Sequence, residues 1–289
     1  MKKKLLWTAA VIGLALPLGA APLTESTFTE VVKDVKIVAN VSKSATPAQP
    51  NDLLKAPDRV RTGPASRAEL TAPDHTITRV GANTVFSYAD SGRTLNLEKG
   101  SLLFHAPKGI GGGTIKSGGV VAAVLGTTLI VSATTDGGFK VILLEGSGKV
   151  TLPNGKSVTL KAGQMVFVAP NGTELSAVLD INLDKLVAGS LLVNGFTNAL
   201  PSQPLIRSAI ARQNNLLASG GAVDTGISAN NATNAPSLAL GLNSLDHGTY
   251  QNAAHPPLSA QKLANFFNPQ PAVAVFGAPG GRGFIPLGF

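Results

Sequence analysis

The side chains that most often bind metals or perform acid–base catalysis are few in this chain and far apart. The four histidines are His75, His105, His247 and His255. None of them is paired at a spacing typical of metal ligands, and the chain has no cysteine. The carboxylates mostly lie beside turn-forming residues: Asp58, Asp74, Asp90, Asp136 and Glu174. Since turn chemistry accounts for such carboxylates, the sequence predicts no metal site and no cofactor.

Two short motifs resemble parts of known catalytic or phosphate-binding sites. Ser259 and Lys262 have the spacing of a Ser–Lys nucleophile pair, but the other segments of that signature are missing. The glycine-rich segment 109–113 lacks the Lys-Ser/Thr and the strand–loop–helix context of a phosphate-binding loop. We therefore expect a protein that is not an enzyme and has no catalytic residues. The enzyme alternative would need a cleft that gathers Glu98, Glu145 or His105.

The N-terminus has the three parts of a secretory signal peptide. Lys2, Lys3 and Lys4 precede an apolar run from Leu5 to Leu18, and small residues follow at 19–21. We expect residues 1–21 to be a signal peptide and the mature protein to be periplasmic or extracellular. An uncleaved membrane anchor is the alternative. No later run is long enough to span a bilayer, so we expect no membrane span after cleavage.

Charge is low and dispersed along the chain. Only 14% of residues are charged, and the formal net charge of +8 falls to +5 without the three N-terminal lysines. No segment is a basic block of the kind that binds nucleic acid, and an exported protein would not meet nucleic acid. We therefore expect no nucleic-acid partner. The absence of cysteine indicates a body that is held together by its core alone.

Residues 22–181 have the pattern of an all-β body. Short apolar or β-branched runs recur between turn residues, with no stretch of helical periodicity. The runs at 127–133 and 139–144 are almost continuously apolar, which predicts central strands that are covered on both faces. Asn154-Gly155 and Asn171-Gly172 predict type I′ hairpins.

The C-terminal third differs from this body. Residues 182–218 predict two helices: one begins at the cap Asn182, and the other begins at Ser202 and ends at Gly220. The second helix has an apolar stripe, which either packs on the β body or binds a partner. Residues 219–289 are rich in Asn, Ala, Ser, Gly and Pro, and we expect a disordered, low-complexity tail.

Six segments, taken in order, resemble the FecR domain family, which is named after the periplasmic regulator of ferric citrate uptake. They are Asp58-Arg-Val-Arg-Thr-Gly-Pro-Ala-Ser-Arg-Ala-Glu-Leu70, Arg79-Val-Gly-Ala-Asn-Thr-Val-Phe86, Leu97-Glu-Lys-Gly-Ser-Leu102, Val124-Leu-Gly-Thr-Thr-Leu-Ile-Val131, Glu145-Gly146 with Val150, and Val158-Thr-Leu-Lys-Ala-Gly-Gln164. The resemblance implies a β-solenoid-like or β-sandwich body.

The family motif also implies a set of residues that mainly maintain the fold. These are Thr62, Gly63, Ser66, Arg67, Ala68, Glu69, Leu70, Gly81, Asn83, Thr84, Gly100, Gly126, Thr127, Glu145, Gly146, Gly163 and Gln164. We expect Arg67 and Glu69 to form a cross-strand or local ion pair, or else to be exposed contact residues. Leu125 stands where relatives usually have Arg, so no contact of that Arg is carried over.

The resemblance implies a role in envelope signalling. Family regulators carry a cytoplasmic anti-sigma domain and a transmembrane helix ahead of the periplasmic domain, whereas only Met1 to Lys4 precede the apolar run here. We therefore expect a FecR-like protein without the anti-sigma domain, which binds an envelope protein through this module, with the helical segment and tail as accessory contacts. The alternative is a structural or surface-polysaccharide-associated envelope protein.

Overall fold

The computed structural model describes residues 20–168, 173–228 and 238–242. From residue 222 onward it describes the backbone alone. The predicted signal peptide lies almost wholly outside the described residues, and so do Asn171-Gly172 and most of the predicted tail.

Strands are the main secondary structure of the described chain, and the helices are few and short, which confirms the all-β prediction. In chain order the strands are β1 (Glu25–Val32), β2 (Val35–Val38), β3 (Ala45–Pro47), β4 (Leu53–Lys55), β5 (Arg59–Thr62), β6 (Arg67–Thr71), β7 (Ile77–Val80), β8 (Val85–Tyr88), β9 (Thr94–His105), β10 (Gly113–Ser117), β11 (Val120–Val124), β12 (Thr128–Ala133), β13 (Phe139–Glu145), β14 (Ser147–Thr151), β15 (Ser157–Lys161), β16 (Gln164–Val168), β17 (Leu179–Ile181), β18 (Ala222–Ser228) and β19 (Leu238–Leu242). The helices are α1 (Leu183–Gly189), α2 (Leu191–Asn194) and α3 (Gln203–Ala218).

The strand pairings define two layers that share β9. Layer A has the order β4-β1-β6-β7-β9-β12-β13-β16-β17-β19-β18. Layer B has the order β3-β2-β5-β8-β9-β10-β11-β14-β15. All pairs are antiparallel except β9 with β10. The chain moves from layer to layer after every one to three strands, so its winding is solenoid-like while its packing is that of a sandwich.

Strand β9 joins the layers because it bends at Gly100. Its first half, from Thr94 to Lys99, pairs in layer B, and its second half, from Gly100 to His105, pairs in layer A. Gly100 has a φ of 92°, which is a left-handed conformation that favours glycine. A side chain there would also collide with the backbone and side chain of Thr84.

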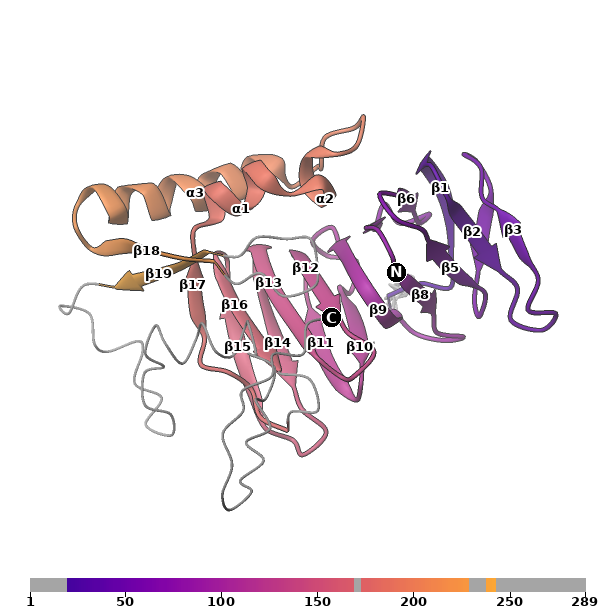
Figure 1. Ribbon diagram of the computed structural model, residues 1–289, viewed down its shortest axis with the longest axis horizontal. Helices are drawn as coiled ribbons and strands as arrows, with labels where there is room; N and C mark the ends of the chain where they lie inside the picture. Colours follow the sequence, from indigo (N-terminus) through magenta and orange to yellow (C-terminus); the bar gives the residue numbers. More distant parts are fainter. Residues whose placement is uncertain (1–19, 169–172, 229–237, 243–289) are drawn as a thin grey trace, which may run out of the picture.

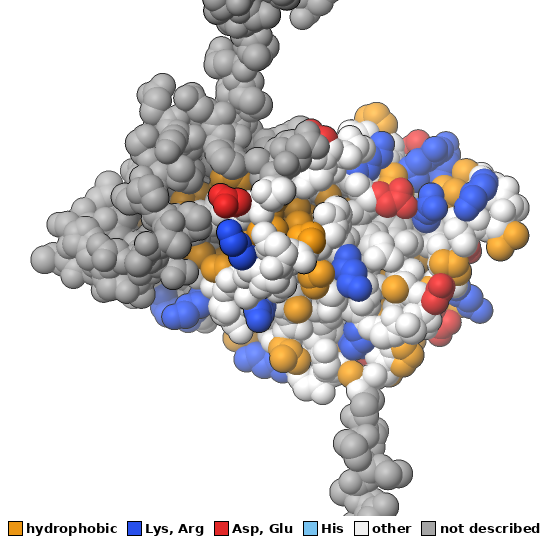
Figure 2. All heavy atoms as spheres, turned by 90° about the horizontal axis from the view of Figure 1, so that it is seen from below, with side chains coloured by type: hydrophobic (Ala, Val, Ile, Leu, Met, Phe, Trp, Pro, Cys, Tyr) orange, Lys and Arg blue, Asp and Glu red, His pale blue; other side chains and the backbone are white. Residues whose placement is uncertain are grey.

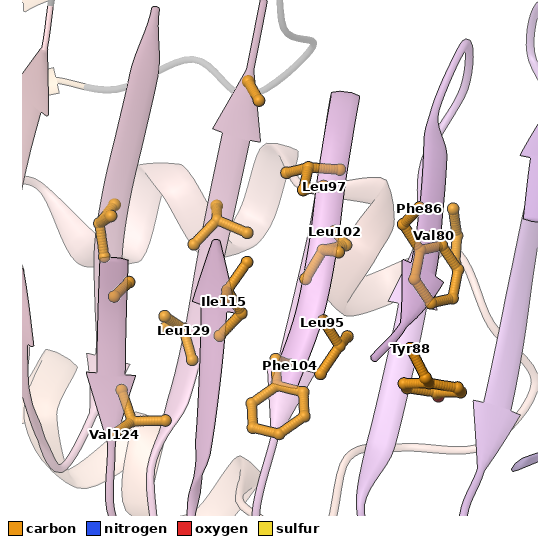
Figure 3. Close-up of a cluster of buried hydrophobic side chains, with 14 of the residues drawn as sticks. Val80, Phe86, Tyr88, Leu95, Leu97, Leu102, Phe104, Ile115, Val124 and Leu129 are labelled. Carbon is orange, nitrogen blue, oxygen red and sulfur yellow. The ribbon is translucent and has the colours of Figure 1, made fainter. Parts of the chain in front are cut away.

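The main core lies between the two layers. Leu129 and Val131 of β12 point into it, and so do Leu102 and Phe104 of β9 (Figure 3). All residues of β12 and β13 are buried, as expected for central strands. The reason is period-two alternation, because the residues between the core residues point to the other face of layer A, where the helices lie.

A second core forms between that outer face and the helices. Ile130, Ile142 and Met165 contribute from the strands, and Leu186 and Ile206 from the helices. Figure 1 shows the three helices grouped along one side of the strands. Within the described residues, none of the helices is long and apolar enough to span a bilayer.

The two predicted helix starts have different outcomes. The Asn182 side chain accepts a hydrogen bond from Lys185 N at 3.1 Å and caps α1, as predicted. Ser202 stands before α3 but makes no side-chain cap bond; its hydroxyl turns to Thr128 instead. Only part of the apolar stripe of α3 is buried. Ile206 and Ala209 are buried, whereas Leu205 and Leu216 are exposed.

Two local expectations need correction. Residues 222–228 and 238–242, within the predicted disordered tail, form β18 and β19, because β17 offers an unpaired edge that hydrogen-bonds to β19. In the β14–β15 turn, Gly155 has a positive φ of 84° but Asn154 does not, so the turn is not type I′. Pro153 accounts for this, because its ring holds φ negative and the chain turns from Leu152, with Gly155 N donating to Leu152 O.

We predict that Gly113→Ala destabilises the sandwich by about 1–3 kcal/mol through overpacking. Gly113 lies on β10 in layer B, and an added Cβ would fall within 2.5 Å of Phe104 Cε1 in layer A. Urea denaturation measures the change. In a Phe104→Leu background the same substitution is expected to cost less. An equal cost in both backgrounds would contradict direct packing of the layers at this point.

Candidate functional site

A buried ion pair lies on the outer face of layer A, beneath the helical segment. Arg79 of β7 donates from Nε to Glu69 Oε2 of the adjacent β6 at 2.8 Å. The two side chains are 0% and 5% exposed. Both point outward because their neighbours Ala68, Leu70 and Val80 point into the main core.

The remaining donors of Arg79 bind backbone carbonyls of the helical segment. Nη1 donates to Val193 O at 2.8 Å and to Leu192 O at 3.2 Å, and Nη2 donates to Asn198 O. The Phe196 ring covers the guanidinium, with its centroid 4.5 Å from Cζ. Thr29 Oγ1 donates to Glu69 Oε1 at 2.8 Å on the strand side. The pair therefore fastens α2 and the following loop to the sheet.

Two flanking contacts reinforce this attachment. Arg67 Nε donates to Gly195 O, and its guanidinium lies 5.8 Å from the Phe196 ring centroid. Glu30 Oε2 accepts from Thr197 N at 2.8 Å. We call Arg67, Glu69, Arg79 and Phe196 the clamp. The expected ion pair between Arg67 and Glu69 is not formed. Glu69 pairs with Arg79 of the neighbouring strand instead, and Arg67 contacts the helical segment.

A second polar cluster fastens the start of α3. Thr128 Oγ1 lies 2.9 Å from His105 Nδ1, 2.8 Å from Glu145 Oε1 and 2.7 Å from Ser202 Oγ. His105, Thr128 and Glu145 come from β9, β12 and β13, which pair side by side. The cluster thus joins three strands to the first residue before α3.

Burial changes the ionisation of this cluster. It lowers the pKa of His105, with a further contribution from the charge of Arg79. Burial also raises the pKa of Glu145, against the hydrogen bond from Thr128. Both shifts favour the neutral forms. His105 and Glu145 both contact Thr128, but both are buried, and Glu98 lies on the part of β9 that belongs to layer B. The arrangement suits attachment of a helix.

Seven of the family-motif residues build one cluster of turns: Thr62, Gly63, Ser66, Gly81, Asn83, Thr84 and Gly100. Thr62 Oγ1 donates to Gly81 O and accepts from Thr84 N, and Thr84 Oγ1 accepts from Ser101 N. Gly63 N donates to Asp34 O, while Asn83 N donates to Gly63 O. Ser66 Oγ accepts from Asp34 N at 3.1 Å. The structure therefore brings together the turns at 62–66, 81–84 and 100–101, beside the bend of β9.

Five further motif residues, Gly126, Thr127, Gly146, Gly163 and Gln164, lie at or beside separate turns. Thr127 Oγ1 donates to Ser147 O at 2.8 Å between Gly126 and Gly146, which both have positive φ. Gly163 packs against the Gln213 side chain of α3. Gln164 Oε1 accepts from Lys161 N, and its Nε2 donates to Asp180 Oδ1.

The sequence reasoning missed three parts of this site. Arg79 stands in a quoted motif but received no role, and Phe196 and Thr128 were not singled out. The signal that could have revealed the ion pair is an Arg on one apolar strand and a Glu on the next strand, at positions that face each other when the two strands pair. Leu125, at the position of the family's usual Arg, is 74% exposed in the turn before β12.

Within the described part of the chain, no group of three or more His, Cys, Asp or Glu side chains is placed to hold a metal ion. An open groove of about 380 Å³ lies elsewhere, on layer B, between the β10–β11 turn and the β12–β13 turn.

Comparison with known proteins gives a family match within the β body. Residues 58–150, called here the FecR domain, match the family model described as FecR protein. No curated protein matches the chain in sequence. Two crystal structures of a proposed anti-sigma factor from Parabacteroides distasonis ATCC 8503 are similar, at 19% and 18% identity and a TM-score of 0.37 each. The similarity covers 41% of this chain and 57% of those chains.

The clamp residues come from both sides of the family boundary. Arg67, Glu69 and Arg79 lie within residues 58–150, and the loop that they bind lies beyond it. The FecR domain thus provides the charged half of an attachment whose other half is the helical segment.

We predict that Arg79→Met lowers the free energy of unfolding by about 3–5 kcal/mol, because it leaves Glu69 buried without a counter-charge. Arg59→Met is the control, since its ion pair with Glu98 is exposed and is expected to contribute less than about 1 kcal/mol. In a Glu69→Gln background, Arg79→Met should cost at least about 1 kcal/mol less. Chemical denaturation tests this, and strictly additive losses would contradict the pair.

We predict that the free energy of unfolding falls as the pH drops below the ordinary His pKa of 6.5, because burial keeps the pKa of folded His105 lower than in the unfolded chain. The unfolded state then binds a proton that the folded state does not, at a cost of up to about 1.4 kcal/mol per pH unit. Urea denaturation between pH 7.5 and 5.5 measures this slope. His105→Gln should reduce the slope and His75→Gln should not; equal slopes would refute the assignment.

Proposed function

We propose that the chain is an exported, non-enzymatic FecR-like module that binds a protein partner in the cell envelope and takes part in signalling there. The family match supports the signalling role, because the family takes its name from a periplasmic regulator. The predicted signal peptide at residues 1–21 supports the location.

The observation that carries the protein-binding role is an exposed apolar row on the attached helices. Leu205 and Leu216 of α3 are 44% and 49% exposed, and Leu191 of α2 is 66% exposed. Leu205 and Leu216 are eleven residues apart, which is about three helical turns, so they lie on one face of α3. Arg212 is exposed on the same side. Leucine rows on a helix face are a common docking surface for protein partners.

Rigidity makes this row suitable for recognition. The clamp and the Ser202–Thr128 contact hold both ends of the α2–α3 connection against layer A. A surface that is already ordered loses less conformational entropy on binding than a free helix does. The polar groups buried under the helices are used for this attachment, which leaves the outward face for a partner.

The test is site-specific photocrosslinking in the native host. We expect a photoreactive residue at Leu205 to capture one discrete envelope protein, and we expect Leu216→Asp to abolish that product. A photoreactive residue at Thr159, on layer B, is the control and should not capture the same protein. Absence of a protein adduct at 205, or the same adduct from both positions, would overturn the proposal.

A further inference from the structure

The outward face of layer B carries basic side chains on most of its strands. They are Lys36 on β2, Arg59 and Arg61 on β5, Lys99 on β9, Lys116 on β10, Lys149 on β14 and Lys161 on β15. We call these seven residues the cationic face. In the amino-acid sequence they are spread over more than 120 residues, which is why no basic block is visible there.

Strand register places them together. Lys36 is opposite Arg61 and Lys149 is opposite Thr159, while their chain neighbours Ile37, Val60 and Val150 belong to the core side. Since alternate residues of a strand point to opposite faces, six of the seven point outward. Lys99 is exposed as well, because a register shift in β9 places it opposite Val85. Layer A is covered by helices on its outer face, but no helix in the described residues packs on this face of layer B.

Few acidic groups balance these charges. Glu98 is the acidic residue on the face itself, and it pairs with Arg59 at 3.2 Å. Lys36 pairs with Asp34 at 3.3 Å. Arg61, Lys99, Lys116, Lys149 and Lys161 form no side-chain ion pair with other residues in the described part of the chain. Five charges are therefore available to an anionic partner.

The groups between the cations are uncharged hydrogen-bonding side chains. The outward positions include Asn96, Thr114, Thr151, Ser157 and Thr159. The open groove lies at one end of the face, beside the β10–β11 and β12–β13 turns, where Asn96, Lys116 and Val121 line it. From β2 to β15 the face spans seven strand spacings, or roughly 30 Å. Figure 2 shows a similar dispersion on the surface that it views, with Lys and Arg side chains standing apart among uncharged ones.

These features decide between classes of anionic partner. Protein interfaces are depleted in Lys and depend on aromatic or Arg anchors in desolvated pockets, whereas this face has five lysines in an open sheet. Single-stranded nucleic acid is bound by aromatic stacking, and Phe86 and Tyr88, the aromatic residues of β8, point into the core. A linear polymer with carboxylates and hydroxyls matches both the spaced cations and the intervening Thr, Ser and Asn side chains.

We infer that the cationic face binds a linear acidic polysaccharide whose carboxylates pair with Lys116, Lys149 and their neighbours, while its hydroxyls bond to the intervening Thr, Ser and Asn side chains. The polymer lies across the strands, because the cations are spread from strand to strand. This function is separate from protein binding by α3, because the two surfaces belong to opposite layers.

Polygalacturonate is the probe, and its binding to the full chain is measured by biolayer interferometry. We expect binding that weakens as salt rises, with no binding to neutral dextran. Lys116→Gln combined with Lys149→Gln is expected to weaken binding about tenfold, since charge-assisted hydrogen bonds are lost. The control pair, Lys55→Gln with Arg207→Gln, removes the same charge from other surfaces and should leave the affinity unchanged.

Several outcomes would overturn this inference. Failure to bind polygalacturonate would do so, and so would an equal loss in the control pair, which would show a response to net charge alone. Three competing probes must bind more weakly than polygalacturonate. Equal binding of polyglutamate would favour an acidic protein as the partner, and equal binding of single-stranded DNA would favour a nucleic acid. Equal binding of dextran sulfate would show that the face responds to charge alone. Leu216→Asp should bind the polysaccharide normally, so this test and the protein-binding test fail independently.

Discussion

The burial of the Arg79–Glu69 pair is the constraint on which the joining of the β body and the helical segment depends. Removing two charges from water costs several kcal/mol per ion, and the pair is stable only when its other hydrogen-bonding groups are satisfied. On the strand side Thr29 bonds to Glu69, but the remaining donors of Arg79 need the carbonyls of residues 192, 193 and 198. The helical segment and the FecR domain are therefore parts of one fold. Lifting the segment would break the bonds of Arg79 to these carbonyls and expose the second core.

The facing sides of the two layers, the outer side of layer A and the outer side of layer B have different roles in this arrangement. The facing sides of layers A and B form the main core, and the outer side of layer A receives the helices. Only the outer side of layer B remains free of helices among the described residues, and it carries the cationic face. The bend of β9 at Gly100 maintains this division, because it moves one strand from layer B to layer A. The proposed protein-binding row and the proposed polysaccharide-binding face consequently lie on opposite sides of one rigid body.

Local patterns were sufficient to predict much of the fold. Continuous apolar runs marked β12 and β13 as strands covered on both faces, and Asn182 marked the start of α1. The type I′ turn was wrongly predicted because the local effect of Pro153 was overlooked. Tertiary contacts decided two other points. Thr128 binds the Ser202 hydroxyl, which therefore does not cap α3. Glu69 was expected to pair with Arg67, but strand register places Arg79 opposite it. The cationic face was invisible in the sequence, since its residues come from six strands that only the fold aligns.

Hydrogen exchange of backbone amides in the full chain tests most directly whether the helical segment and the FecR domain form one body. Amides in the middle of α3, such as Ala209 and Ile210, are compared with Ile130 and Ile142 of the central strands under conditions where exchange reports opening free energy. The account predicts that both groups open with the same free energy, that of global unfolding. Exchange of α3 at a much lower free energy, with the strands still protected, would show that the helices detach on their own and would contradict the account.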